Sequence, residues 1–195
     1  MKHSLDLFEQ PVPVLRAPEA DDAGRIADLA DGFASGEAYA PQGDLMSNAA
    51  FRDTSVVAEL EGELVGGVTA YRLPYDPQTL FIWHADVAET ARDQGLSSLM
   101  MGYLMRQEAC VGVTRVQTAI APMDERAWTL FRHFARWQRS HMEIQMFITQ
   151  ALTPFAQHET DHLVTILLQD ARLVEPDQIP TVVPIAHTPA QANPI

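Results

Sequence analysis

Cysteine is nearly absent from this 195-residue sequence, which contains only Cys110. A single thiol excludes an intramolecular disulfide bond and a zinc site built from cysteine ligands. The N-terminus MKHSLDLFEQ lacks the basic start and apolar stretch of a signal peptide. No apolar run approaches the roughly 20 residues that a membrane-spanning helix needs. We therefore expect a cytoplasmic protein without a membrane segment.

Basic residues are also scarce. Lysine and arginine together number 13 against 26 acidic residues, which gives a net charge of −13, and Lys2 is the only lysine. Such a charge excludes nucleic acids and anionic membranes as natural partners, because their negative charge would be repelled. It is compatible with a cationic small-molecule substrate.

Hydrophobic residues make up 47% of the chain, which is typical of a globular protein. The length suits one domain with a full core. We expect a flexible lead-in over residues 1–11, one domain over 12–172 and a tail over 173–195. The tail is rich in proline and alanine and shows no hydrophobic period.

The hydrophobic pattern along the chain predicts alternating strands and helices. A short helix is expected within 35–48, and turns are expected at 61–63 and 74–77. The predicted strands cover 12–15, 54–60, 64–71, 80–87, 113–121, 142–148 and 163–168, and the longer helices cover 21–33, 95–104 and 124–137. This order describes a mixed α/β layer.

The segment from Arg92 to Ser97 connects a predicted strand to a predicted helix. The first amides of a helix lack partners within it, and the helix dipole adds partial positive charge there. Gly95 and the small Ser97 allow an anion to approach the backbone. The segment therefore predicts a pyrophosphate site, although an ordinary tight connection gives the same pattern. It lacks the additional glycines of a Rossmann turn and the Gly-Lys-Ser/Thr ending of a P-loop.

These six residues fit the pattern R/Q-x-x-G-x-G/A loosely, with Ser97 at the last position, and the segment resembles the coenzyme A loop of the GCN5-related N-acetyltransferase family. The resemblance implies an α/β fold with a mixed, mostly antiparallel sheet flanked by helices, and acetyl-CoA as co-substrate. It also implies a set of residues that bind the co-substrate, among them strand residues whose amides stabilise a developing oxyanion. These residues are Ala85, Val87, Arg92, Gln94, Gly95, Leu96, Ser97 and Asp124.

Longer motifs resemble the diaminobutyrate acetyltransferases of ectoine synthesis. The motifs are Phe51–Glu59, Asp76–Trp83, Ala91–Leu96, Arg115–Thr118, Leu130–Arg132 and His158–Ile166. They span roughly three-fifths of the chain in the right order. The resemblance implies that an acetyl group passes from acetyl-CoA to the side-chain amine of L-2,4-diaminobutyrate by direct attack in a ternary complex. It further implies a homodimer.

The resemblance also assigns residues to the acceptor site. Trp83, Tyr39, His84 and Asp161 are expected to bind the amine substrate. Asp161 and His158 are the expected catalytic pair, because a neutral amine must attack the thioester and a base must remove its proton.

Several positions depart from the family pattern. His84 stands where the family usually has Gln, Asp93 where it has Gly, Asp124 where it has Asn, and Asp161 where it has Glu. Ala34 stands where an acidic substrate contact is expected. These departures leave two alternatives open, an acetyltransferase for another small amine or amino acid and a non-catalytic acetyl-CoA-binding module.

The segment His158–His162 also matches the zinc protease pattern H-E-x-x-H. That chemistry requires both histidines on one face of a helix. Because Pro154 precedes the segment and a predicted strand follows it at once, we expect no helix and no metal.

Overall fold

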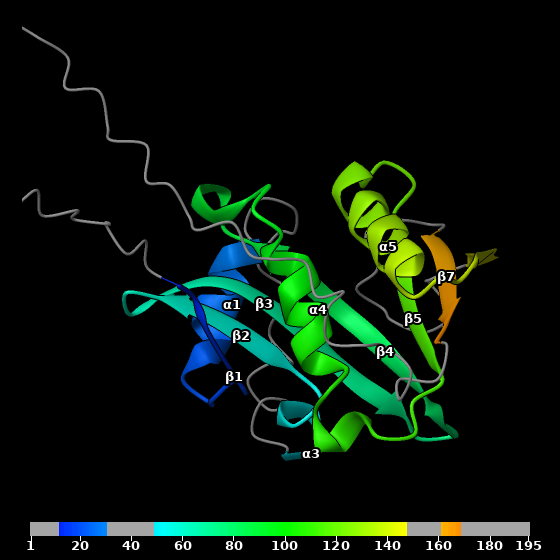
Figure 1. Ribbon diagram of the computed structural model, residues 1–195, viewed down its shortest axis with the longest axis horizontal. Coiled ribbons are helices and arrows are strands. Elements are labelled where there is room, and N and C mark those ends of the chain that lie inside the picture. The colour runs from blue at the N-terminus through cyan, green and yellow to red at the C-terminus, as the bar shows by residue number, and fades with distance from the viewer. Residues whose placement is uncertain (1–11, 31–48, 148–160, 169–195) are drawn as a thin grey trace, which may run out of the picture.

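The computed structural model describes residues 12–30, 49–147 and 161–168, which form a seven-stranded sheet flanked by helices (Figure 1). The strands are β1 (Val14–Arg16), β2 (Val56–Leu60), β3 (Glu63–Leu73), β4 (Asp76–Val87), β5 (Arg115–Ile120), β6 (Met142–Phe147) and β7 (Asp161–Leu167). The helices are α1 (Asp22–Ala30), α3 (Ala49–Arg52), α4 (Leu96–Leu104) and α5 (Glu125–Trp137), with short 3-10 turns η1 (Glu89–Ala91) and η2 (Glu108–Cys110).

The strand order across the sheet is β1-β2-β3-β4-β5-β7-β6. The pair β4–β5 is parallel, and the other neighbouring pairs are antiparallel. A parallel pair requires a crossover connection, and α4 lies on that connection. The predicted mixed, mostly antiparallel sheet is therefore confirmed.

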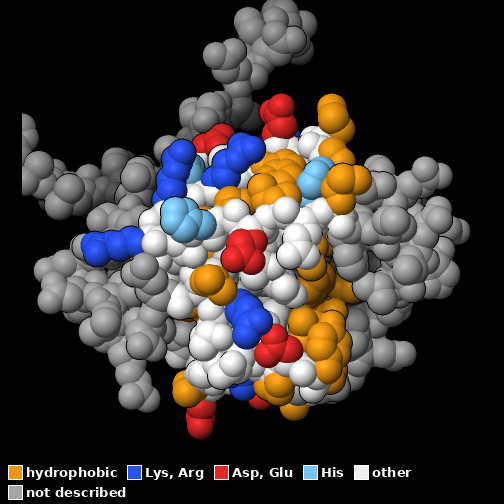
Figure 2. Space-filling view, turned by 90° about the vertical axis from the view of Figure 1, so that its right-hand side faces the viewer, with side chains coloured by type: hydrophobic (Ala, Val, Ile, Leu, Met, Phe, Trp, Pro, Cys, Tyr) orange, Lys and Arg blue, Asp and Glu red, His pale blue; other side chains and the backbone are white. Residues whose placement is uncertain are grey.

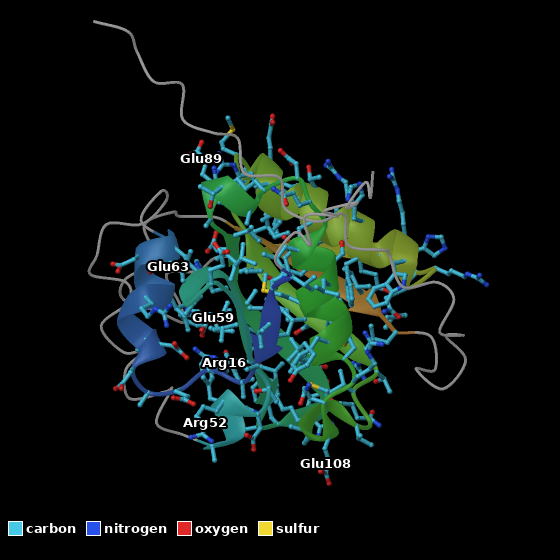
Figure 3. All side chains as sticks on the ribbon, turned by 60° about the vertical axis from the view of Figure 1, so that its left-hand side comes forward. Arg16, Arg52, Glu59, Glu63, Glu89 and Glu108 are labelled. Atoms are coloured by element: carbon cyan, nitrogen blue, oxygen red, sulfur yellow. The ribbon has the colours of Figure 1, made fainter. Side chains whose placement is uncertain are left out.

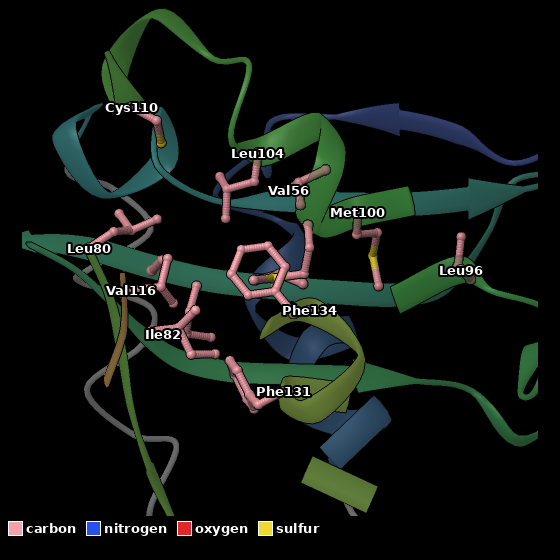
Figure 4. Packing of buried hydrophobic residues seen from close by; sticks show 14 of the residues in the cluster. Val56, Leu80, Ile82, Leu96, Met100, Leu104, Cys110, Val116, Phe131 and Phe134 are labelled. Atoms are coloured by element: carbon pink, nitrogen blue, oxygen red, sulfur yellow. The ribbon is translucent and has the colours of Figure 1, made fainter. Parts of the chain in front are cut away.

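Helices cover both faces of the sheet, and the alternation of side chains along β2 shows this directly. Val56 and Ala58 pack in the larger core with α4 and α5, whereas Val57, between them, packs with Ile26 of α1 and Phe51 of α3. Figure 4 shows the larger core, in which residues of α4 and α5 meet the strands. We call the face under α1 and α3 the α1 face, and the opposite one the α4 face.

Hydrogen bonds between charged side chains link α1 to the edge of the sheet. The Asp22 carboxylate is almost fully buried and accepts hydrogen bonds from Arg16 Nη1 at 2.5 Å and Arg25 Nη1 at 3.3 Å. Arg16 also donates to Glu59 at 2.9 Å, and both side chains are labelled in Figure 3. Burial alone raises the pKa of Asp22, but hydrogen bonds from Arg16 and the Glu19 amide outweigh it and hold that pKa below its ordinary value.

Some boundaries differ from those predicted. The turn after β3 is confined to Pro74 and Tyr75, and β4 begins at Asp76 rather than at residue 80. The helix α3 was not predicted, because four residues are too few to show a helical period. The predicted short helix within 35–48, the lead-in and the tail lie outside the described residues.

Candidate active site

The turn before α4 has the backbone geometry of an open anion site. Gly95 is the N-cap of α4 with φ +77°, a conformation that strongly favours glycine. Within the described part of the chain no side chain caps this end of the helix, so its first amides keep their capacity to donate. A Cβ built on Gly95 would meet no atom within 4 Å. The turn therefore offers donors and open space together.

The other residues of this turn are held by local contacts. Arg92 Nε donates to the carbonyl of Val87 at 3.2 Å, which ties the turn to the end of β4. Gln94 Nε2 donates to the carbonyl of Thr90 at 3.3 Å, while Gln94 Oε1 is buried without a partner among the described residues. Asp93 is exposed and adopts φ +60°. A carboxylate thus stands beside the predicted phosphate site.

The strands β4 and β5 part next to this turn. Their pairing runs from Thr79 opposite Arg115 to Ile82 opposite Thr118, whereas β4 continues to Val87. On its other edge β4 stays paired with β3 as far as Val87 opposite Gly66. Among the described strands, the second half of β4 therefore has a neighbour on one edge only.

The amides of Ala85 and Val87 point toward the edge of β4 that is no longer paired with β5. The amide of Ala88 donates to the carbonyl of Val65 on β3 at 2.9 Å. Amide directions alternate along an antiparallel pair, so those of Ala85 and Val87 point away from β3. Both residues were predicted to bind the co-substrate, and the geometry is that of donors aimed at a group lying between β4 and β5.

A β-bulge lies in β4 at the start of this open half. Thr69 pairs with His84 and Ala70 with Ile82, which leaves Trp83 as the extra residue. Trp83 is 42% exposed, and its ring centroid lies 6.4 Å from those of both Tyr71 and Phe81. Together with Phe51, these rings form an aromatic wall on the α1 face.

His84 Nε2 and Asp86 Oδ2 form a close contact. Their partners on β3 are Thr69 and Gly67, and the Cβ position of Gly67 faces Ile26 and Val57. The pair therefore lies on the α1 face, next to the aromatic wall. Asp86 was not singled out in the sequence, although a spacing of two in a strand already places it on the same face as His84.

The structure describes the remaining predicted site residues to different extents. Asp124 is the N-cap of α5, and its Oδ1 accepts from the Ala127 amide at 3.0 Å. Ser97 lies in the first turn of α4. Asp161 opens β7 opposite Phe147, but its side chain lies outside the described residues, as do all of His158 and Tyr39.

The zinc protease interpretation fails on backbone geometry. His162 lies in β7, paired with Ile120 on one side and Met146 on the other, so it does not lie on the helix that the motif requires. Among residues 12–30, 49–147 and 161–168, no three acidic, histidine or cysteine side chains group as metal ligands. In the same ranges no helix is both long and apolar enough to span a membrane.

The sequence and the fold were compared with those of known proteins. The model of the acetyltransferase (GNAT) family matches residues 25–135. The L-2,4-diaminobutyric acid acetyltransferase of Halomonas elongata is 32% identical over 154 residues, covering 78% of this chain and 79% of that protein. The corresponding enzyme of Methylotuvimicrobium alcaliphilum is 29% identical over 156 residues, covering 80% and 91%.

A solved structure supports the same family relationship. The diaminobutyrate acetyltransferase of Paenibacillus lautus, solved in complex with L-2,4-diaminobutyric acid and coenzyme A, superposes with a TM-score of 0.68 at 31% identity. The match covers 81% of this chain and 96% of that one.

Proposed function

Because the chain belongs to the acetyltransferase (GNAT) family, and within it to the L-2,4-diaminobutyric acid acetyltransferases, we propose that it acetylates the side-chain amine of L-2,4-diaminobutyrate with acetyl-CoA. The observation that carries this proposal is the likeness to the Paenibacillus lautus enzyme, whose structure holds that amine and coenzyme A. The resemblance supports a role in ectoine synthesis, and a cytoplasmic location suits that role.

The pyrophosphate of the donor binds at the N-terminus of α4. The uncapped amides of Leu96 and Ser97 donate to it, and Gly95 gives it room. Arg92 and Gln94 shape the turn through their bonds to the Val87 and Thr90 carbonyls. Asp124 acts by capping α5, which follows β5 on the far side of the opening.

The acetyl group lies where β4 and β5 part. The amides of Ala85 and Val87 point into this opening. A backbone amide fixed in a strand needs no reorganisation when negative charge develops on the carbonyl oxygen, and this is the property that makes an oxyanion site effective.

The acceptor binds on the α1 face, beside Trp83 and His84, with Tyr39 as a further contact. At neutral pH diaminobutyrate carries two ammonium groups and one carboxylate. A buried ammonium without an anionic partner is costly, so the site needs an acidic residue. Asp161 takes this role at the start of β7, and His158 orients the substrate. The amine attacks the thioester directly in a ternary complex.

One acetyltransferase domain covers residues 12–172, and the family model lies within it. The protein acts as a homodimer. Exposed apolar side chains of β6 and β7 support this assembly, namely Ile144, Met146 and Leu167. Figure 2 views the side of the molecule with α5, β6 and β7 and shows hydrophobic side chains reaching its surface.

The test is an assay of thiol release with acetyl-CoA and a series of amines. Diaminobutyrate, ornithine, lysine and simple polyamines are compared, and the position of the acetyl group is read by NMR. Burial raises the pKa of Cys110 to about 11, so the protein's own thiol adds little background. Turnover of diaminobutyrate at the side-chain amine is expected. If another amine reacts and diaminobutyrate is inert, the acceptor is wrong. If acetyl-CoA binds and every amine is inert, the protein is a non-catalytic module.

A further inference from the structure

A hydrogen-bonded polar pair joins β5 to β7 on the α1 face. Gln117 Nε2 donates to Thr165 Oγ1 at 3.0 Å, and the two residues stand opposite each other in the β5–β7 ladder. Thr165 is 9% exposed, and Gln117 is partly buried. Their neighbours Val116, Val164 and Ile166 pack in the larger core on the α4 face, so the pair points to the opposite face. This is the face on which the acceptor is proposed to bind.

The pair lies beside the aromatic wall and near the reaction site. Gln117 is the partner of Phe81, a ring of that wall, in the parallel β4–β5 ladder. The ladder ends at Thr118, so the opening for the acetyl group begins near Ala119. Two residues of a strand span about 6.6 Å, a distance that a glutamine side chain shortens. A small amino acid whose amine reaches the thioester therefore has its other end near Gln117.

The hydrogen-bonding groups that this pair still offers suit the head group of an amino acid. A glutamine amide has two N–H hydrogens, and the bond to Thr165 uses one of them. The second amide hydrogen of Gln117 and the hydroxyl hydrogen of Thr165 are two adjacent donors for the two oxygens of a carboxylate. The amide oxygen of Gln117 can accept from an ammonium on the neighbouring carbon.

We propose that Gln117 and Thr165 form the subsite for the α-carboxylate of the acceptor, and that this subsite makes the enzyme select amino acids over plain diamines. This inference rests on the proposed function and names the end of the acceptor that determines specificity. An amine without the carboxylate leaves the two donors without a partner in a partly buried place. Such a loss is what makes a hydrogen-bonding site selective.

Arg115 is the competing partner for a carboxylate. It lies on β5 two residues before Gln117, on the same face and about 6.6 Å further from the opening. Its Nη1 is 3.5 Å from Asp76 Oδ2, at the start of β4. The guanidinium is therefore already beside a carboxylate at the far end of the strand, and we assign the subsite to Gln117 instead.

A cross-strand pair that only stabilises the sheet is the other explanation. It predicts that loss of Gln117 lowers thermal stability and lowers the turnover of every amine in the same proportion. A carboxylate subsite predicts a different division. Turnover of an amino acid falls, mainly through a higher KM, while turnover of a diamine without a carboxylate stays.

The experiment compares L-2,4-diaminobutyrate with 1,3-diaminopropane, which is the same diamine without the carboxylate. The ratio of their kcat/KM values is measured in the full chain for the wild type, Gln117→Ala, Gln117→Glu and Thr165→Val. Gln78→Ala is the matched control, because Gln78 is exposed near the start of β4, away from the opening. Arg115→Gln tests the competing partner.

The wild type should prefer diaminobutyrate by about 10-fold to 100-fold, the range for a hydrogen bond to a charged group. Gln117→Ala and Thr165→Val should lose about tenfold or more of kcat/KM for diaminobutyrate, with the value for diaminopropane within about twofold of wild type. Gln117→Glu should act on diaminopropane faster than the wild type, because its carboxylate repels an acid and attracts an ammonium. A gain of this kind cannot come from a misfolded protein.

The two amines separate this inference from the proposed function. Equal turnover of both by the wild type, or an equal loss of both in Gln117→Ala, overturns the subsite while acetylation of diaminobutyrate stands. Loss of the preference in Arg115→Gln, with the preference kept in the Gln117 variants, assigns the carboxylate to Arg115 and also overturns it. If the wild type turns over neither amine, the proposed function fails and the subsite falls with it.

Discussion

The amide of Leu99 donates to the carbonyl of Gly95 over 3.0 Å, and this bond closes the first turn of α4. The three amides before Leu99 in the helix therefore lack acceptors within α4. No side chain among the described residues caps them, so these amides are the donors of the proposed pyrophosphate site.

Gly95→Glu should abolish acetyl-CoA binding. The added carboxylate would occupy the open space beside Gly95 and repel the pyrophosphate. Calorimetry measures the affinity, and circular dichroism checks the fold. Gly62→Glu is the matched control, because Gly62 also has a positive φ, +87°, and open space around its Cβ position. It carries the same backbone strain in the β2–β3 turn. Unchanged affinity in Gly95→Glu would falsify the placement of the donor.

Asp93→Gly should strengthen acetyl-CoA binding by about twofold to fivefold at low salt, as expected for removing an exposed like charge worth about 0.5–1 kcal/mol. It also relieves the φ of +60° at a residue with a Cβ. Asp93→Asn removes the charge alone and separates the two effects. Glu61→Gly, at another exposed position with φ +51°, should leave affinity unchanged. Equal affinity in all variants would show that no phosphate lies near Asp93.

Asp161→Asn should lower diaminobutyrate turnover by about 10²-fold, the low end for losing a group that handles the acceptor's proton and charge. Asp161→Glu restores the family's longer acid. It should shift the preference between ornithine and diaminobutyrate toward the shorter amine, because the carboxylate reaches one methylene further. Competition between the two amines with NMR detection measures this ratio. An unaltered ratio with unaltered turnover would remove Asp161 from the acceptor site.

Asp22→Asn should destabilise the fold by about 2 kcal/mol, less than the roughly 3–5 kcal/mol of a fully buried pair because Arg16 partly reaches water. Since the folded-state pKa of Asp22 is lowered, its contribution is complete above the ordinary value of 3.8 and is lost as pH falls through the lower folded value. Urea denaturation between pH 3 and 7 measures this. The exposed Asp28→Asn on the same helix is the control, and a similar loss there would contradict the assignment.

Chelators should leave acetyl transfer intact, and purified protein should carry no stoichiometric zinc. His162 lies in a strand and does not complete a helical zinc motif. Elemental analysis and an assay with excess chelator measure this. One tightly held zinc per chain would contradict it.

Much of the fold was predictable because its signals are local. The β2–β3 turn was marked by Glu61 and Gly62, which both adopt positive φ. The helices α4 and α5 showed clear hydrophobic periods. The turn at Gly95 was found from the change of period between β4 and α4.

The acceptor side was less predictable, because it depends on one inserted residue. Strict alternation after Phe81 places Ala85 and Val87 on the same face as Trp83, and His84 and Asp86 on the other. The bulge at Trp83 reverses this. One extra residue in a strand leaves no mark on composition or period, so the position of His84 and Asp86 on the α1 face was visible only in the structure.

Because β5 separates from β4 after Thr118, bound acetyl-CoA would take the place of a neighbouring strand along the second half of β4. Acetyl-CoA that accepts hydrogen bonds from Ala85 and Val87 completes the ladder that β5 leaves unfinished after Thr118. Binding and folding are then thermodynamically linked. Donor at a hundredfold excess over its Kd should add about 2.7 kcal/mol to the free energy of unfolding. The amides of Ala85 and Val87 should pass from fast to slow hydrogen exchange in the same titration.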